Sequence, residues 1–323
     1  MPDHTKSDID ATAPEVPETK GTGEGTTVAG PSRTEREFTV AERSQAQLVI
    51  RRFLQHRLAV GSLIVLLAVV LLAFVGGALW KYNVADITPD ESQPPSWEHP
   101  FGTDAVGHDS FAQVLRGTQI SLGVAVLVAL IATFVGTIWG AVAGFYRGWL
   151  DTVLMRIADL VLTLPLLAVA AVLGDVAGGS WWLIAFIIGG LYWAYVSRVA
   201  RGVVLSLREK EFIEASKALG ASDLRIIFKH LVPNALGSVI VNATILVAIA
   251  ILIETALSYL GFGVRPPDTS LGLLVSDNQT AVSTRPWLFY FPGLFIIIIA
   301  LTINFIGDGL RDAFDPQQKK VRA

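Results

Sequence analysis

The sequence predicts an all-α integral membrane protein with six transmembrane helices. Of its 323 residues, 52% are hydrophobic and only 16% are charged, whereas a typical soluble domain carries about 25% charged residues. The apolar residues are gathered in runs of roughly 20, the length that a helix needs to cross a hydrocarbon core about 30 Å thick. Because a segment inside a bilayer must satisfy its own backbone hydrogen bonds, runs of this length are expected to be helical.

Six apolar runs supply the predicted spans. They lie at residues 58–80, 120–143, 152–173, 181–197, 236–260 and 287–306. The first run follows Arg51, Arg52 and Arg57 and begins too far from Met1 for a cleaved signal, so it is expected to remain as a membrane anchor. Pro165 is expected to kink the third span.

Both ends of the chain are predicted to lie outside the membrane. Residues 1–48 are rich in Thr, Glu, Pro, Gly and Ser and hold few large apolar side chains, so they cannot bury enough surface to offset the entropy lost on ordering. We interpret them as a disordered tail, and residues 308–323 as a short C-terminal tail. The organisation between them is a first transmembrane helix at 58–80, a connecting segment at 81–118 and a five-helix membrane domain at 119–307.

The distribution of Lys and Arg predicts the orientation. Cytoplasmic flanks of membrane proteins carry an excess of these residues. With the N-terminus inside, sixteen of the twenty Lys and Arg from residue 51 onward fall on the inner flanks. Both termini are therefore expected in the cytoplasm, with residues 81–118 and 261–286 outside and one large cytoplasmic loop at 206–235.

Several function classes find no support in the sequence. A net charge of -3 disfavours a nucleic-acid partner, because such proteins carry a concentrated basic face. The absence of cysteine excludes a disulfide, a thiol nucleophile and a zinc-thiolate site. The sequence contains neither a phosphate-binding loop of the form G-x-x-x-x-G-K-[ST] nor an H-E-x-x-H metal motif, so we predict no catalytic residue and no metal site.

The cytoplasmic loop carries the most informative pattern, two short amphipathic helices on either side of Gly220. Gly220 can adopt the left-handed conformation that ends a helix, and Ser222 or Asp223 can cap the next helix. Pro233 is expected to stop that second helix. The apolar positions are Phe212, Ala215 or Ser216, and Leu219 on the first helix, and Leu224, Ile227, Phe228 and Leu231 on the second. This stripe is expected to hold the loop at the membrane surface, with its charged groups facing the cytoplasm.

On periodicity alone, this loop is either an interfacial hairpin without a partner or a docking element. Its residues resemble the signature of ABC importer permeases, which reads Glu-Ala-Ala, three residues, Gly, nine residues and Ile-x-Leu-Pro. Glu214, Ala215, Gly220 and Pro233 match this signature, whereas Ser216, His230 and Val232 depart from it. Because His before x-x-Pro-Asn is common in the peptide-importer branch, His230 narrows the resemblance to that branch.

Three further segments resemble the C-type permease of oligopeptide and dipeptide ABC importers. The first is His99-Pro-Phe-Gly-Thr-Asp104 followed by Gly107-His-Asp109, after the first span. The second runs from Ile253 to Pro267, at the end of the fifth span, and the third runs from Asn304 to Pro316. Together with the loop, these segments cover roughly residues 50–316 in the order of the family.

The resemblance implies a type I ABC importer permease fold in the cell membrane of a bacterium. It implies a complex with a second homologous permease, two ATPase domains that use ATP and Mg, and an external substrate-binding protein, so that this chain is not itself the enzyme. The cargo implied is a peptide, and nickel, glutathione and glycosides remain as alternatives within the same branch. A different alternative is a membrane scaffold or sensor that binds a cytoplasmic partner without transport. The loop residues expected to couple the chain to the ATPase are Glu214, Ala215, Ser216, Gly220, Asp223, His230 and Pro233.

Polar residues inside the predicted spans are further candidates. Glu254 is expected to face inward, because an ionised group in a bilayer costs a few kcal/mol unless it finds a partner or water. It either lines the cargo pathway or makes a buried hydrogen bond between helices. Arg156 and Asp159 are three residues apart and share a helix face, so they are expected to pair, mainly as a structural pin. Asn242 and Asn304 are expected to hydrogen-bond across helices.

Overall fold

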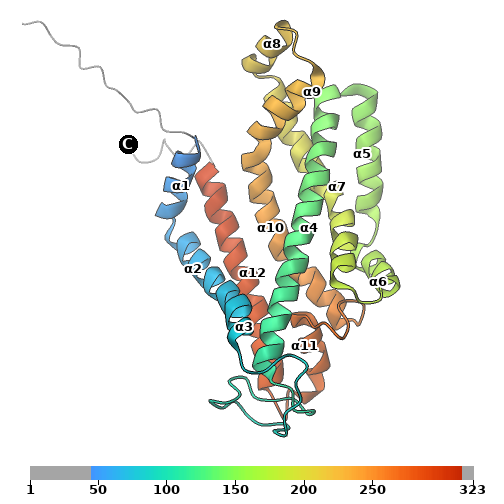
Figure 1. Cartoon of the computed structure of the whole chain (residues 1–323). Helices are drawn as coiled ribbons and strands as arrows, with labels where there is room; N and C mark the ends of the chain where they lie inside the picture. The colour runs from blue at the N-terminus through green and yellow to red at the C-terminus, as the bar shows by residue number, and fades with distance from the viewer. Residues whose placement is uncertain (1–44, 315–323) are drawn as a thin grey trace, which may run out of the picture. The chain divides into compact units, whose positions relative to one another are not determined.

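The computed structural model describes residues 45–314, so most of the expected tails at 1–48 and 308–323, namely residues 1–44 and 315–323, lies outside the described residues. Within the described range, every regular element is a helix (Figure 1). These elements are α1 (Gln45–Gln55), α2 (Arg57–Leu71), the π-helical η1 (Leu72–Gly76), α3 (Gly77–Leu79), α4 (Ser110–Tyr146), α5 (Gly148–Thr163), α6 (Leu166–Val176), α7 (Trp181–Arg208), α8 (Glu211–Ala218), α9 (Asp223–Ile226), the π-helical η2 (Ile227–Leu231), α10 (Val232–Tyr259), α11 (Leu271–Asp277), the 3₁₀ turn η3 (Gln279–Ala281) and α12 (Trp287–Phe314).

The membrane spans follow the predicted order but differ in length. Within residues 45–314, five helices are long and apolar enough to cross a bilayer, and a sixth span results if the bent pair α5 and α6 is counted as one. The predicted N-terminal tail ended at residue 48, but α1 already begins at Gln45. The predicted C-terminal tail began at residue 308, but α12 continues to Phe314.

The third span is broken rather than kinked. α5 ends at Thr163 and α6 begins at Leu166, and the two axes differ by 81°. Leu164 and Pro165 between them have extended backbone angles, because the residue before a proline is disfavoured in the helical region. The predicted disturbance at Pro165 is therefore confirmed, and its size is larger than that of a kink.

The centre of the bundle is the contact between α4 and α7. A Cβ atom added to Gly140 of α4 would lie 2.2 Å from the carbonyl oxygen of Ser197 in α7, and one added to Gly136 would lie 2.6 Å from that of Trp193. Small residues one turn apart let two helix backbones approach closely, which is how membrane helices pack without a hydrophobic driving force between them. These two glycines therefore hold α4 and α7 in one register.

The segment between the first and second spans, residues 81–109, packs as a cap over the start of α4, and we call it the cap segment. Asp109 is the N-cap of α4 and accepts a hydrogen bond of 2.7 Å from the backbone N–H of Ala112. The same carboxylate lies 2.7 Å from Nδ1 of the buried His99 and accepts a hydrogen bond from Nε1 of Trp80. This strong cap explains why α4 begins at Ser110, ten residues before the predicted span.

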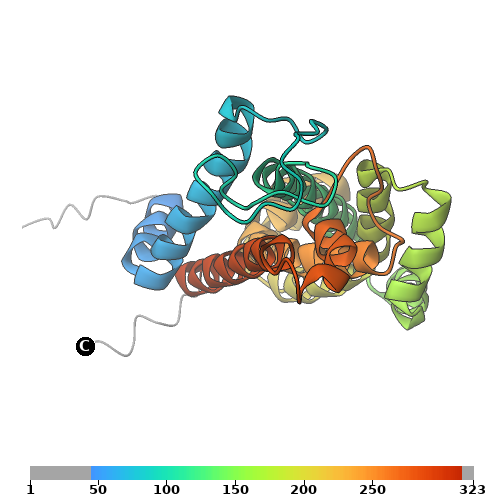
Figure 2. The same cartoon turned by 90° about the horizontal axis from the view of Figure 1, so that it is seen from below.

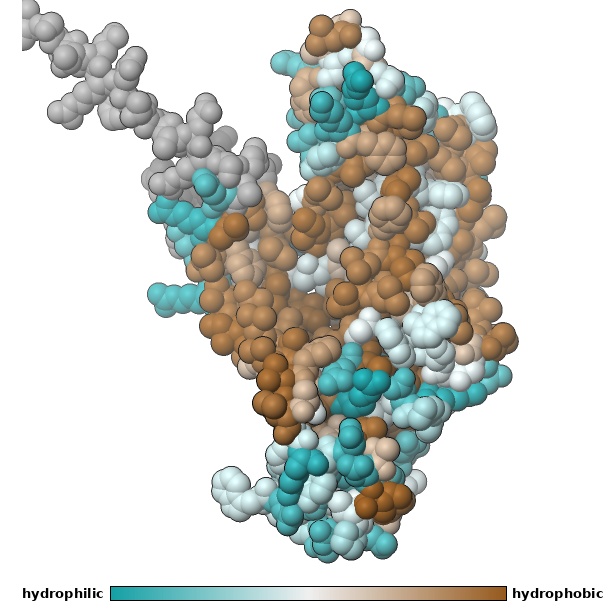
Figure 3. Space-filling view, viewed as in Figure 1, coloured by the Kyte–Doolittle hydropathy of each residue, from teal (hydrophilic) through white to brown (hydrophobic). Residues whose placement is uncertain are grey.

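Figures 1 and 2 show that α1 and α2 lie at one edge of the bundle and that α5 and α6 lie at the opposite edge. α2 packs against α12, and α5 packs against α7. On the face shown in Figure 3, the middle is hydrophobic, while the cap segment and the opposite end are largely hydrophilic. A hydrophobic belt between two polar ends is the surface expected of a protein that spans a bilayer.

Candidate functional site

The main candidate site is the element that joins α7 to α10, residues 211–231, which we call the elbow. Figure 1 shows α8 projecting beyond the ends of α4 and α5, with α9 near the level of those ends. Gly220 has φ of +77° and follows α8, as predicted. Its N–H donates to the carbonyl of Lys217, and the N–H of Ala221 donates to that of Ser216. These two bonds form a Schellman motif, so the turn depends on a residue that tolerates positive φ.

The apolar side chains of the elbow divide into a buried set and an exposed set. The buried set is Ile213, Ile226, Ile227 and Leu231, which pack with Ala141 and Phe145 of α4 and Val204 of α7. The exposed set is Leu219 (88% exposed), Leu224 (64%), Phe228 (50%) and Phe212 (42%). The predicted single stripe was therefore wrong, because the residues that anchor the elbow and the residues that it presents lie on different faces.

Contacts to Phe145 of α4 fix the position of the elbow. Arg208, the last residue of α7, donates to the carbonyl oxygen of Phe145, and its guanidinium lies 5.8 Å from the ring centroid. Nζ of Lys217 in α8 lies 5.5 Å from the same ring, within the range of a cation–π contact. The elbow is thus fastened to the ends of α4 and α7 by both apolar and cationic contacts.

The second arm of the elbow does not end at Pro233. α9, η2 and α10 run on as one helix from Asp223 to Tyr259, with Pro233 in the first turn of α10. A proline inside a helix lacks an N–H and its ring conflicts with the carbonyl four residues earlier. The π-helical turn accommodates it, because the N–H of Val232 bonds to the carbonyl of Ile227, five residues back. The prediction of a stop at Pro233 was therefore wrong.

The remaining signature residues lie along both arms. Glu214 and Ala215 are exposed on α8, and Ser216 donates from Oγ to the carbonyl of Phe212. Asp223 lies in the first turn of α9, where a negative charge is favourable. His230 is half-buried in η2, and its carbonyl oxygen accepts a 2.6 Å hydrogen bond from Nδ2 of Asn234. Ser222 occupies the N-cap position of α9 but makes no capping hydrogen bond with its side chain.

A second candidate, Glu254, lies in the last two turns of α10 and is fully buried. Ser121 of α4 donates to its Oε2 at 3.0 Å, and Ser258 donates to its Oε1 at 2.7 Å. Both carboxylate oxygens are therefore satisfied from within this chain. The arrangement favours the structural alternative for Glu254 over a direct contact with cargo.

The serines around Glu254 extend this network to the connection between α10 and α11. The N–H of Leu271 donates to Oγ of Ser121, and the N–H of Val264 donates to Oγ of Ser258, both at 3.2 Å. Ser270 caps α11 and lies 3.2 Å from Ser258 through their hydroxyl oxygens. The sequence reasoning missed these serines, although a serine four residues after Glu254 on the same helix face was a signal that could have found Ser258.

The expected pair between Arg156 and Asp159 is not the pair that forms. Asp159 of α5 instead pairs with Arg198 of α7, and Arg201 of α7 binds both carboxylate oxygens of Asp151 at 2.6 and 2.7 Å. Arg198 was missed because the predicted fourth span ended at Ser197, whereas α7 continues for eleven more residues to Arg208. Arg156 lies exposed on α5.

The two asparagines expected to bridge helices bond within their own helices. Nδ2 of Asn242 donates to the carbonyl of Ser238 at 2.8 Å, and Nδ2 of Asn304 donates to that of Ala300 at 2.9 Å. Both bonds reach back four residues along the helix, so neither joins two helices. The expectation for these residues was therefore wrong.

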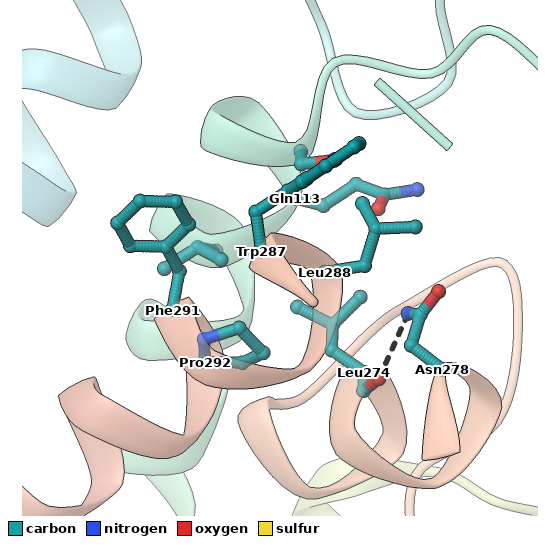
Figure 4. Close-up of a pocket in the computed structure, with 9 residues that line it drawn as sticks. Gln113, Leu274, Asn278, Trp287, Leu288, Phe291 and Pro292 are labelled. Atoms are coloured by element: carbon teal, nitrogen blue, oxygen red, sulfur yellow. Dashed lines mark hydrogen bonds between the residues drawn. The ribbon is translucent and has the colours of Figure 1, made fainter. Parts of the chain in front are cut away.

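Figure 4 shows a small cavity where the start of α4 meets α11 and α12. It is lined by Gln113, Leu274, Asn278, Trp287, Leu288, Phe291 and Pro292, among others, and has a volume of about 10 Å³. Asn278 donates to the carbonyl of Leu274 at its edge. A space of this size holds about one water molecule, so it is a packing defect and not a cargo site. Among the described residues, no cluster of His, Asp and Glu is arranged to hold a metal ion.

The fold has a solved counterpart. It is similar to a chain of the inward-facing MetNI methionine ABC transporter, with a TM-score of 0.52 and 19% sequence identity over 63% of this chain and 97% of that chain. With the apolar spans and the projecting elbow, this likeness defines the class as a type I ABC importer permease fold.

Sequence comparisons give the family. Residues 136–320 match the binding-protein-dependent transport system inner membrane component, and residues 44–95 match the N-terminal transmembrane domain of oligopeptide transport permease C. The oligopeptide transport system permease protein OppC of Mycobacterium bovis is 41% identical over 86% of this chain and 97% of its own length. OppC of Bacillus subtilis is 38% identical over 83% and 88%. The chain therefore belongs to the OppC family of ABC transporter permeases, non-catalytic membrane subunits whose ATPase is a separate subunit.

Proposed function

We propose that this chain forms half of the translocation pathway of an ATP-driven importer for oligopeptides or dipeptides. Family membership supports the role of a permease, and the relatives named above, which are oligopeptide permeases, support a peptide as the cargo. The observation that carries the coupling to a separate ATPase is the exposed apolar set of the elbow, led by Leu219 and Leu224.

The exposed apolar set of the elbow indicates a binding surface for a protein partner. Large apolar side chains gathered on a polar end of a membrane protein, outside the hydrophobic belt, mark an interaction site. The Gly220 turn directs α8 outward, while Ile213 and the Phe145 contacts keep its base in place. A rigid element that is anchored at one end and apolar at the other is suited to transmit the motion of a docked ATPase subunit to α7 and α10.

The proposed orientation puts the elbow and both termini in the cytoplasm of a bacterial cell and the cap segment outside. The start of α1 and the end of α12 lie at the same end of the bundle as the elbow (Figure 1). Lys210, Lys217, Arg225 and Lys229 gather at this end, as expected of a cytoplasmic flank.

The full complex that we propose contains a second homologous permease, two ATPase domains and an external substrate-binding protein. ATP and Mg are used by the ATPase domains, and this chain supplies the pathway and the elbow. Binding of ATP shifts the pathway between inward-open and outward-open states, which it can do only because the ATPase domains bind ATP with different affinity in the two states.

Reconstitution tests this proposal. The chain is purified with its partner subunits in liposomes, and uptake of a labelled tripeptide is measured with and without ATP and binding protein. ATP-dependent uptake of the peptide supports the proposal. Uptake of nickel, glutathione or a glycoside in place of the peptide would mean that this compound is the cargo. A complex that binds its partners but transports none of these compounds would favour the role of a scaffold.

A further inference from the structure

A polar face within the membrane-spanning part of the chain is not explained by the elbow or by Glu254. Thr152, Arg156, Asp159 and Thr163 of α5 recur at intervals of four, three and four residues, so they share one side of the helix. All four lie at the surface of the subunit. The neighbouring side of α5 carries the exposed apolar residues Val153, Ile157 and Leu160. α5 therefore presents two different exposed surfaces to two different environments.

α7 completes the polar face with two arginines. Arg198 pairs with Asp159, and Arg201 pairs with Asp151, across a cleft of about 380 Å³ between the two helices. The cleft is lined by Asp151, Thr152, Met155, Asp159, Arg198 and Arg201.

The depth of these charges decides what they face. Arg198 lies ten residues, about 15 Å, before the end of α7, which is apolar enough to span a membrane, and its partner Asp159 lies eleven residues after the start of α5. Its side chain is 54% exposed and that of Asp159 is 38% exposed. Ionised side chains at this depth do not face lipid; they face a water-filled cavity or another protein surface.

The two ion pairs differ in a way that separates their roles. The pair of Arg201 with Asp151 is bidentate, and the side chain of Asp151 is only 13% exposed, so it holds α5 against α7. The pair of Arg198 with Asp159 is more exposed, and exposed pairs contribute about 0 to 1 kcal/mol. It can therefore open at little cost and exchange its partner for a charged group of the cargo.

We propose that this polar face of α5 and α7 is a wall of the water-filled cargo pathway, in the half of the membrane nearest the elbow. The carboxylate of Asp159 meets the terminal ammonium of a peptide, and the guanidinium of Arg198 meets its terminal carboxylate, so the pair accepts zwitterionic backbones of any side-chain sequence. This inference rests on the proposed function, because it takes a peptide as the cargo.

Cysteine accessibility tests the wall without any need for transport. The native chain has no cysteine, so single cysteines at Thr152 and Thr163 can be compared with matched controls at Ile157 and Leu160 on the apolar side of the same helix. In the reconstituted complex, a charged water-soluble thiol reagent should modify the first two at least about tenfold faster, because such reagents react with thiolates in water. Labelling is read as a mass shift of this chain. No labelling of Thr152→Cys and Thr163→Cys would mean that another protein surface covers this face, and equal rates on both sides would mean that the polar side is no more accessible to water than the apolar side. Either result would overturn the inference.

Peptides with blocked ends test the charge assignment. Arg198→Ala should raise the KM for a free tripeptide about tenfold and leave the KM for its C-terminal amide unchanged, and Asp159→Ala should do the same for the free and N-acetylated peptides. An equal loss for blocked and unblocked peptides would assign the pair a structural role and overturn the assignment. If the wild-type complex takes up no peptide at all, both the proposed function and the assignment of Asp159 and Arg198 to the peptide termini are refuted. The labelling result still decides whether the polar face is in water.

Discussion

Glu254 of α10 accepts a hydrogen bond of 3.0 Å from Ser121 of α4, and this contact joins two helices through residues 133 positions apart in the sequence. The second carboxylate oxygen accepts from Ser258 of its own helix. Because backbone N–H groups of Leu271 and Val264 donate to the same serines, one carboxylate organises the whole turn between α10 and α11. Glu254 is thus an acceptor at the centre of a network of donors.

This relationship predicts the effects of two substitutions at one site. Glu254→Gln keeps one strong acceptor and should cost about 1 kcal/mol or less, with the range of accepted peptides unchanged. Glu254→Leu leaves two buried hydroxyl groups without an acceptor and should cost about 1 to 3 kcal/mol for each of them. The thermal unfolding midpoint of the purified complex and a peptide competition assay measure both effects. A changed peptide preference in Glu254→Gln at normal stability would assign Glu254 to the pathway instead.

The sequence predicted the spans well because each depends on a local property, the length of an apolar run. It predicted Gly220 for a similar reason, since a glycine after an amphipathic stretch indicates a helix end wherever the chain lies. It failed at Pro233 because the π-helical turn that accommodates the ring is a property of the surrounding helix and not of the proline.

The sequence could not show which polar residues meet. Spacing along one helix favoured Arg156 as the partner of Asp159, but the arginine that reaches it lies 39 residues away on α7. Likewise, the elbow's apolar residues were visible in the sequence, but their division between Ile213 on the buried side and Leu219 on the exposed side depends on how α8 packs against α4. Such pairings are set by tertiary packing.

The surroundings of Asp104 in the cap segment predict that the stability of the fold depends on pH. Burial raises the pKa of this carboxyl, but hydrogen bonds from the N–H groups of His108 and Val106 and from the His108 ring outweigh burial and hold the pKa below its usual value of 3.8. A carboxyl whose pKa is lower in the folded than in the unfolded state stabilises the fold at pH values above its unfolded-state pKa. This stabilisation is lost as the pH falls through the folded-state pKa. Asp104→Asn should therefore lower the unfolding midpoint at pH 7, and the difference from wild type should shrink below about pH 4.

Tryptophan fluorescence during heating measures this effect, with Glu98→Gln as the control. Glu98 pairs with Lys81 in the same segment, and both side chains are exposed, so its substitution should leave the midpoint unchanged. A difference between Asp104→Asn and wild type that stays constant down to pH 3 would refute the assignment of the stabilisation to the ionised carboxylate.

The proposed orientation predicts a labelling pattern. Cysteines at Ser96 in the cap segment and at Thr280 in η3, both exposed, should react with an impermeant thiol reagent on intact cells. A cysteine at Ser222 in the elbow should react only after the cells are opened. Since the native chain has no cysteine, the unmodified protein is the control. Reaction of Ser222→Cys on intact cells would reverse the orientation.

The role of the elbow as the coupling element depends most directly on Gly220. A Cβ atom at this position would meet no atom within 4 Å, so a substitution there acts through the backbone conformation and not through a clash. A non-glycine residue at positive φ costs about 1 to 2 kcal/mol, Asn tolerates it better, and a β-branched residue is a clear outlier. Lys217 is unsuitable as a control because it contacts Phe145. Gly61 in α2, exposed and with equally open surroundings, provides the matched control.

The deciding measurement is the ATP hydrolysis of the reconstituted complex with and without binding protein and peptide. Gly220→Val should abolish the stimulation and reduce recovery of the ATPase subunit in a pull-down, Gly220→Asn should retain most of both, and Gly61→Val should behave as wild type. Full stimulation in Gly220→Val, with the ATPase subunit still bound, would contradict the account of the elbow as the element that couples ATP hydrolysis to transport.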